Sequence, residues 1–358
     1  MGRQSVSRFL LVALLSFSAL VSTRAEWTED TSVGSVQQWY GITSSSDGTK
    51  LAAAVIDGNI WTSTDSGATW TENTSTGGIK KWYFIASSSD GTKLAATVWQ
   101  GKIWTSTDSG ATWTEVGSTN AWHGITISND GTKLAATVWQ GNIWTSTDSG
   151  ATWTEVTSIT STKLWSAIAS SSDGTKLAAS ASHGGNIWTS TDSGATWTEA
   201  TSVGSANSLY GITSSSDGTK LAAFHSSGNT GQISGIWTST DSGATWTEVT
   251  SIGGAKSWYG ITSSSDGTKL AASVWGGNIW TSADSGATWT EDTSNGGMKN
   301  WHAITLSGDG TTLAATVMNG NIWTYHTLPT CTSCQAKLKK LGLFVDEECK
   351  LLEAEVVS

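Results

Sequence analysis

The chain has 358 residues, with 19 Lys and Arg against 29 Asp and Glu, which gives a net charge of −10. An acidic protein offers no basic face to phosphates, so the charge argues against nucleic acid and anionic membranes as partners. Tryptophan is abundant, with 23 residues, whereas Cys occurs three times and Pro once.

The first 25 residues predict a secretory signal peptide. Arg3 and Arg8 form a basic start, and residues 9–20 form an apolar run that is too short to be kept as a membrane span. Residues 23–25 fit a cleavage site. The mature chain would then hold no arginine and a net charge near −13. No later segment is long and apolar enough for membrane insertion, so we expect a secreted, extracellular protein.

Residues 26–328 consist of near-copies of one unit, with the pattern SxxDxGxTxxAA…GxIWTSTDSGATWTE. The first unit reads as four short strands, over residues 39–44, 50–56, 59–63 and 69–72. Asp-Gly between runs of β-forming residues is a strong hairpin signal. Four antiparallel strands repeated about every 43 residues are typical of a β-propeller blade. The predicted fold class is therefore all-β.

The number of copies predicts how the repeats close into a ring. The Asp-Gly turn occurs seven times, at Asp47, Asp90, Asp130, Asp173, Asp217, Asp266 and Asp309. The fourth-strand tryptophan also occurs seven times, but its first copy, Trp27, precedes the first complete unit. The last unit stops after its third strand. We therefore predict a seven-bladed β-propeller in which the N-terminal strand completes the last blade. The third- and fourth-strand tryptophans are expected to form the cores between blades.

The segment S-T-D-S-G-A-T-W resembles the Asp-box, or BNR repeat, of the sialidase-like propellers over residues 27 to about 325. Its six copies lie at Asp65, Asp108, Asp148, Asp192, Asp241 and Asp284, and Ala283 replaces Thr in the sixth. The resemblance implies that each box closes the turn between strands three and four, on the face away from a ligand. These aspartates would then be structural.

The resemblance also invites enzymatic hypotheses, which the composition argues against. Sialic acid hydrolysis in that family needs three arginines, and the mature chain has none. Other glycoside hydrolases need two opposed carboxylates outside the periodic positions, where the propeller offers only Glu26, Asp30, Asp57 and Asp292. We expect no enzyme, no cofactor and no metal, and keep glycoside hydrolysis as an alternative.

Two sets of residues are candidates for ligand binding on the face opposite the boxes. The loops between strands two and three carry Trp99-Gln100, Trp139-Gln140 and Trp275. An indole can stack on a sugar ring while an amide binds its hydroxyls, and repeated weak sites add avidity. The alternative is that these indoles fill gaps between blades. The second set starts strand one and comprises Tyr40, Tyr83, His123, Tyr210, Tyr259 and His302. These side chains would either bind a ligand at the channel mouth or only line the channel.

Residues 329–358 differ in composition from the repeats and predict a short helical tail. The tail contains Cys331, Cys334 and Cys349. Exported proteins meet oxidising conditions, so we expect a disulfide between two of these cysteines rather than a zinc site that the cysteines form with His326. One internal disulfide leaves one thiol, through which the tail could support an oligomer.

The sequence thus predicts an exported, non-catalytic binding protein whose partner is a glycan or an extracellular protein. The chain is also similar to the photosystem II stability and assembly factors, which are seven-bladed Asp-box propellers. That similarity implies a scaffold or assembly factor as an alternative. The basic, arginine-bearing partner surface of that family is missing from the mature chain.

Overall fold

The computed structural model describes residues 27–183, 185–203, 208–225, 234–254 and 256–326. Within these ranges the chain consists of β-strands and one 3-10 turn, η1 (Thr201–Val203), and no helix is long and apolar enough to cross a bilayer. The predicted signal peptide, the helical tail and its three cysteines lie outside the described residues. Residues 27–324 form one compact unit, to which the following description refers.

The first complete sheet follows the predicted hairpins. It comprises β2 (Gln37–Ser44), β3 (Leu51–Gly58), β4 (Ile60–Ser63) and β5 (Thr71–Asn73), each antiparallel to the next. The first five residues of β3 are all buried. This continuous burial is expected for a strand whose two faces are both covered, and the small alanines allow neighbouring sheets to approach closely.

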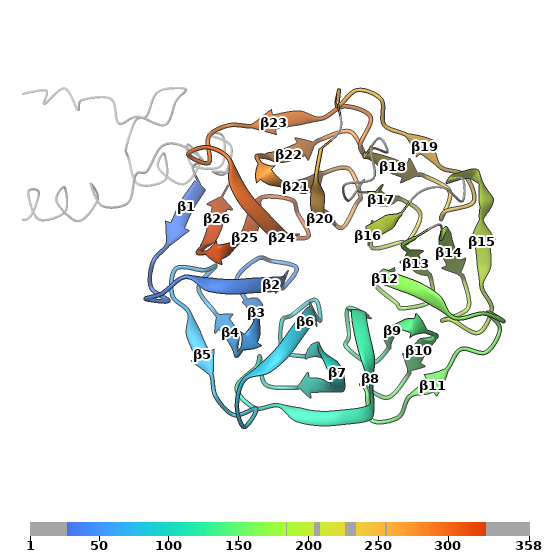
Figure 1. Cartoon of the computed structure of the whole chain (residues 1–358), viewed down its shortest axis with the longest axis horizontal. Coiled ribbons are helices and arrows are strands. Elements are labelled where there is room, and N and C mark those ends of the chain that lie inside the picture. Colours follow the sequence, from blue (N-terminus) through green and yellow to red (C-terminus); the bar gives the residue numbers. More distant parts are fainter. Residues whose placement is uncertain (1–26, 184, 204–207, 226–233, 255, 327–358) are drawn as a thin grey trace, which may run out of the picture. The chain divides into compact units, whose positions relative to one another are not determined.

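The same arrangement recurs along the chain, and the sheets lie around a common axis (Figure 1). Two strands are longer, β7 (Leu94–Ser106) and β8 (Thr114–Ile127), because each spans two strand positions of the repeat. The remaining strands are β6 (Lys80–Ser87), β9 (Leu134–Gly141), β10 (Ile143–Ser146), β11 (Thr154–Glu155), β12 (Lys163–Ser170), β13 (Leu177–Ala181), β14 (Ile187–Ser190), β15 (Thr198–Ala200), β16 (Leu209–Ser214), β17 (Leu221–His225), β18 (Gly235–Ser239), β19 (Thr247–Glu248), β20 (Trp258–Ser263), β21 (Leu270–Gly277), β22 (Ile279–Ser282), β23 (Thr290–Asp292), β24 (Lys299–Leu306) and β25 (Thr312–Gly320).

The two ends of the described chain meet in one sheet. Strand β1 (Trp27–Asp30) pairs with β26 (Ile322–His326), and Figure 1 shows this blue strand beside the red one. Asn321 Nδ2 donates to Glu29 Oε1 at 3.0 Å. Trp27 Nε1 donates to Asp292 Oδ2 at 2.8 Å, and its ring lies 5.7 Å from that of Trp301. The first strand is therefore anchored to two sheets near the end of the chain.

A circuit of backbone hydrogen bonds connects the inner ends of the sheets. Each bond runs from an N–H to the carbonyl oxygen of the equivalent residue in the next repeat, at 2.7–2.9 Å. The circuit passes through Ser46, Ser89, Asn129, Ser172, Ser216, Ser265 and Gly308 and returns to Ser46. Every participating repeat is thus bonded to both of its neighbours around the axis.

The turns between the third and fourth strands share one hydrogen-bond pattern, and we call them the DSG turns. In the first, Asp65 Oδ1 accepts from the backbone N–H of Thr69 at 2.9 Å, and Asp65 Oδ2 accepts from its hydroxyl at 2.6 Å. Ser63 Oγ accepts from the N–H of Gly67 at 2.9 Å. The middle serine, Ser66, has φ of 60°. The other five aspartates repeat these bonds, so all six carboxylates are engaged within their own turns.

The largest fully buried side chains among the described residues are tryptophans of the first strands, which are not among the core residues predicted from the sequence. They are Trp39, Trp82, Trp122, Trp165, Trp258 and Trp301. Trp82 Nε1 donates to the carbonyl oxygen of Gly58 in the preceding sheet at 3.1 Å. The third-strand tryptophans pack edge-on against these rings and stay partly exposed. The cores between sheets therefore rest on the first- and fourth-strand indoles more than on those of the third strand.

Candidate ligand-binding site

Ten aromatic side chains are linked by ring contacts at the end of the channel opposite the DSG turns, and we call them the aromatic rim. Neighbouring ring centroids in the series are 4.5–6.5 Å apart. The members are Tyr40, Tyr83, Trp99, His123, Trp139, His183, Tyr210, Tyr259, Trp275 and His302. The two sets of candidate residues predicted from the sequence thus form one continuous surface.

The first-strand members of the rim point toward the channel because side chains alternate in direction along a strand and because the strand register shifts at the same place in each repeat. Each follows the deeply buried residue of its strand, as Tyr40 follows Trp39, so the two side chains point to opposite sides. The strand register then shifts, in β2 between Trp39 and Gly41. Equivalent shifts occur in the other first strands. A bulge of this kind bends a strand and turns a side chain in a new direction, and bulges are frequent next to binding sites.

Four members of the rim, Tyr40, Tyr210, Tyr259 and His302, line a cavity of about 190 Å³. Phe84 and Phe224 complete its aromatic lining, and the rest of the wall is glycine, alanine and isoleucine. Sites for drug-sized ligands usually have about 300–1,000 Å³. The cavity therefore admits a group the size of a single ring, with the remainder of a ligand lying over the rim.

The three loop tryptophans pack on first-strand members of the rim. Trp99 stacks on Tyr83, with centroids 5.1 Å apart and planes inclined by 17°. Trp275 lies 4.9 Å from Tyr259, and Trp139 lies 5.5 Å from His123. All three indoles stay partly exposed. The packing and binding interpretations are therefore compatible, because each indole has one side held by the rim and another part open to solvent.

The polar residues beside these indoles lie in an unusual backbone conformation. Gln100 and Gln140 are exposed and have φ of 55° and 57°. Asp57, His183 and Asn319 have φ of 54–55° at the equivalent loop position, where the sixth repeat has a glycine. Left-handed conformations are uncommon for residues other than glycine and can mark functional sites. The loops thus hold polar side chains next to the indoles, at a position whose positive φ would suit glycine better.

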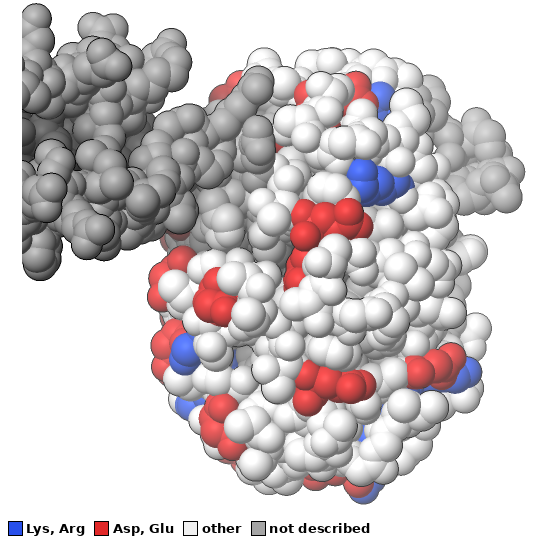
Figure 2. Space-filling model, turned by 90° about the vertical axis from the view of Figure 1, so that its left-hand side faces the viewer, with Lys and Arg blue, Asp and Glu red and all other residues white. Residues whose placement is uncertain are grey.

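Buried groups of the rim are neutral at physiological pH. Burial lowers the pKa of His123 to about 4, and its Nδ1–H donates to the carbonyl oxygen of Ser166 at 2.6 Å. Burial likewise lowers the pKa of His302 to about 4, and its Nδ1–H donates to the carbonyl oxygen of Tyr40 at 3.0 Å. The pKa of the Tyr40 phenol is raised by burial and by the neighbouring Tyr83 and Tyr259. These buried groups therefore carry no charge. Burial and the nearby Asp57 carboxylate raise the pKa of the Tyr83 phenol, and further carboxylates occur on the outer surface shown in Figure 2.

The loop asparagines are engaged by the periodic glutamates of the fourth strands. Asn59 Nδ2 donates to Glu72 Oε1 at 2.9 Å, and Asn142 Nδ2 donates to Glu155 Oε1 at 2.8 Å. Three further Asn–Glu pairs repeat this bond. The amide nitrogens of these asparagines fix the loops and are not free for a ligand. No group of three or more His, Cys, Asp or Glu side chains that could hold a metal ion is found in the described part of the chain.

Three residues of this region, His183, Phe84 and Phe224, are not among the candidates predicted from the sequence. Phe84 lines the cavity and lies 5.3 Å from the ring of His123. It occupies the position of Gly41, Gly124, Gly211 and Gly260 in other repeats. A departure from the repeat was therefore the signal that could have identified Phe84. Conversely, the fourth repeat has Ser166 in place of a rim ring, and its hydroxyl bonds to backbone carbonyls.

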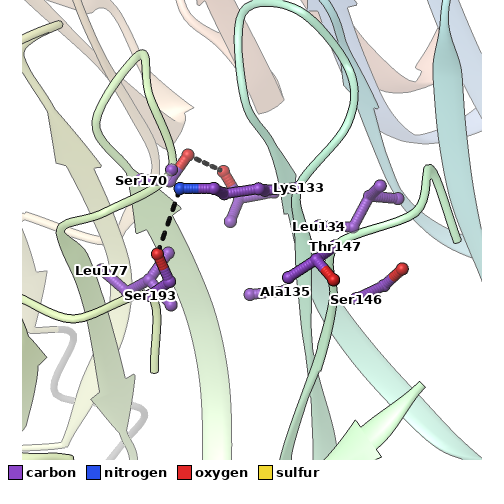
Figure 3. Close-up of a pocket in the computed structure, with 10 residues that line it drawn as sticks. Lys133, Leu134, Ala135, Ser146, Thr147, Ser170, Leu177 and Ser193 are labelled. Carbon is purple, nitrogen blue, oxygen red and sulfur yellow. Dashed lines mark hydrogen bonds between the residues drawn. The ribbon is translucent and has the colours of Figure 1, made fainter. Parts of the chain in front are cut away.

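Two other cavities offer fewer groups for binding a ligand. A cavity of about 160 Å³ at the opposite end of the channel is lined almost entirely by serine and threonine. A smaller one, of about 10 Å³, lies between neighbouring sheets (Figure 3). There Lys133 Nζ donates to Ser193 Oγ at 3.2 Å, which connects one sheet to the DSG turn of the next. A volume of this size holds at most one water molecule.

No family model matches the sequence, and no curated protein matches it. The fold is similar to several solved β-propellers. YCF48 from Cyanidioschyzon merolae has a TM-score of 0.65 at 16% identity, over 84% of this chain and 99% of that one. A YCF48 structure with a bound D1 peptide gives 0.66 at 15% identity, over 85% and 98%. A catalytically inactive virginiamycin B lyase from Staphylococcus aureus, with quinupristin, gives 0.69 at 22% identity, over 85% and 100%. These likenesses establish a β-propeller fold.

Proposed function

We propose that this β-propeller is an exported, non-catalytic binding protein that recognises a neutral carbohydrate through its aromatic rim. The single observation that supports this function is the continuity of the rim. Partly exposed indoles beside polar loop residues pack on the first-strand rings of the rim, and four of these rings line a cavity the size of one ring. Aromatic faces and uncharged polar groups are the surfaces that suit sugar rings and their hydroxyls.

The architecture we propose is a seven-bladed Asp-box propeller closed by its first strand. Its support is the hydrogen-bond circuit through Ser46 and its equivalents and the pairing of β1 with β26. The repeated bonds in the six DSG turns support the resemblance to Asp-boxes. In this arrangement the variable loops and the rim share one end of the channel, and the repeated turns occupy the other.

We propose that the protein has no catalytic activity, although similar folds include a lyase as well as YCF48. The DSG carboxylates are engaged in their turns. Most of the periodic glutamates are bonded to the loop asparagines described above. The segment after the predicted signal peptide has no arginine to grip an anionic substrate. These occupied or missing groups are the ones that glycoside hydrolysis and sialic acid recognition would require.

An extracellular protein is the second candidate partner, in the role of a scaffold or assembly factor. One observation favours it, namely three exposed apolar side chains in equivalent loops between sheets. Val36, Ile79 and Met298 are 62%, 70% and 75% exposed. Such residues are typical of contacts between proteins when they lie close together. The similar YCF48 structure holds a peptide of D1.

A glycan array with the purified protein would test the carbohydrate proposal. We expect binding to neutral glycans and about a tenfold or greater loss of affinity in Trp99→Ala and Trp275→Ala, since stacking on an aromatic ring is removed. Trp99→Phe and Trp275→Phe are the matched controls, because they keep an aromatic face. Normal folding without binding to any glycan would reject this proposal and favour a protein partner. Turnover of aryl glycosides that one carboxylate substitution abolishes would reject the absence of catalysis.

A further inference from the structure

A lysine–tryptophan contact recurs away from the aromatic rim. In four repeats, the residue two positions before the deeply buried first-strand tryptophan is a lysine. Its Nζ lies 4.4–4.8 Å from the ring centroid of the third-strand tryptophan in the same sheet. The pairs are Lys80–Trp104, Lys163–Trp188, Lys256–Trp280 and Lys299–Trp323. An ammonium over an indole face is attracted by the negative face of the ring. This position in the fold therefore accommodates an ammonium group.

Two repeats have an amide in place of that lysine. Gln37 takes the position in β2, and Asn120 takes it in β8. Each amide nitrogen donates to the hydroxyl of the serine two residues earlier, at 2.9 Å and 3.0 Å. In the part of the chain that the structure describes, no lysine ammonium lies over the ring of Trp61 or Trp144. Both indoles are partly exposed.

A carboxylate lies next to each of these two indoles. Trp61 is directly opposite Glu72 in the antiparallel pair of β4 and β5, and Trp144 is directly opposite Glu155 in that of β10 and β11. Directly opposed residues of antiparallel strands have their side chains on the same face of the sheet. Both glutamates are exposed. Their partners in the preceding loops, as described above, are neutral amides, and no lysine within the described ranges forms an ion pair with either glutamate.

We propose that Trp61 with Glu72 and Trp144 with Glu155 form two binding sites for lysine side chains of a partner protein. Four repeats provide the ammonium from their own chain, whereas these two accept it from another molecule. The net charge of −10 favours the approach of a basic segment. Two such sites in one molecule bind a lysine-rich segment more tightly than a single lysine. The inference is independent of the carbohydrate proposal, because none of these residues belongs to the aromatic rim.

Titration of the full chain with a pentalysine peptide, followed by NMR of the indole N–H groups, would test the proposal. Trp61→Phe and Trp144→Phe assign the two signals. We expect both signals to shift, while those of Trp104 and Trp188 stay in place because a lysine of the same chain already lies over each ring. Equal shifts at all four indoles, or no shift at any of them, would overturn the proposal.

A charge-inserting variant gives the sharper control. In the double variant Gln37→Lys and Asn120→Lys, the new lysines are expected to cover both indoles and weaken peptide binding about tenfold. The matched variant Gln37→Met and Asn120→Met has side chains without charge and should keep the binding. Undiminished binding in the lysine variant would contradict the inference. Thermal unfolding of both variants shows that they remain folded, and Trp275→Phe in the rim should leave peptide binding unchanged.

Discussion

Replacing Trp27 with alanine measures how firmly the first strand is held. Trp27 and its equivalent Trp70 are both 7% exposed, so the two indoles are buried to the same extent. Loss of a buried tryptophan side chain costs about 3–5 kcal/mol of unfolding free energy. If β1 is held by β26 as tightly as β5 is held by β4, then Trp27→Ala and Trp70→Ala each destabilise the protein by about 3–5 kcal/mol. The loss is expected to be larger at Trp27, because its Nε1 donates to Asp292 whereas Trp70 Nε1 has no hydrogen-bond partner among the described residues.

A conservative substitution separates the two contributions at Trp27. Trp27→Phe keeps an aromatic ring against Trp301, 5.7 Å away in the parent protein, but removes the hydrogen bond from Nε1 to Asp292. Hydrogen bonds to charged groups contribute about 1.5–3 kcal/mol. We therefore expect Trp27→Phe to lose roughly half of the free energy that Trp27→Ala loses.

Urea unfolding, followed by both tryptophan fluorescence and circular dichroism, provides the measurement. Coincident transitions from the two probes indicate that the ring unfolds as one unit, which makes the comparison of free energies valid. The reasoning is refuted if Trp27→Ala stays within about 1 kcal/mol of the parent while Trp70→Ala loses the expected 3–5 kcal/mol. The first strand would then contribute little, and the ring would not depend on closure by β1.

Three further predictions concern pH and the rim loops. Between pH 6.5 and about 4, His123 and His302 become protonated in the unfolded chain but stay neutral in the folded protein, so the stability of the protein falls as pH decreases. The double variant His123→Asn and His302→Asn should show a weaker dependence of the melting temperature on pH, measured by thermal melts at a series of fixed pH values. Hydrogen bonds from Ser128 and Thr132 lower the pKa of Asp130 from 3.8 to about 2. The contribution of Asp130 to protein stability is therefore present above pH 3.8 and is lost as pH falls through 2. Asp130→Asn should weaken the decrease in stability over this acidic range. Gln100→Gly with Gln140→Gly should raise the melting temperature slightly, because glycine accepts positive φ, yet weaken glycan binding; unchanged affinity would show that these amides do not contact the ligand.

The strand pattern could be predicted from the sequence because its turns have few backbone solutions. Asp-Gly and Asp-Ser-Gly segments fix where each hairpin reverses, so the second strand expected at residues 50–56 is observed as β3, Leu51–Gly58. Trp27 was identified as a displaced fourth-strand residue from its neighbours in the repeat, and the structure places it in a strand paired with β26.

The arrangement of the candidate site could not be predicted in the same way. Stacking of Trp99 on Tyr83 depends on a register shift in the first strand, which no sequence pattern reveals. The pairing of Lys80 with Trp104 joins residues 24 positions apart, across two intervening turns. Exposure of an indole also depends on neighbours from another repeat. These features follow from tertiary contacts between units, whereas repeat counting reports only what each unit has in common with the others.

The pairing of β1 with β26 has a consequence for the order of events during synthesis. Residues 27–30 leave the ribosome before the sheets that follow them, whereas residues 322–326, their partners, emerge only after residues 31–321 have been made. Until then the newly made sheets have two unpaired edges, which are prone to association with other chains. A chaperone that covers these edges would be needed only for this interval. Its requirement should decrease in a circular permutant whose ends lie in a loop between two repeats, such as residues 74–79, because no sheet is then divided between the two ends of the chain.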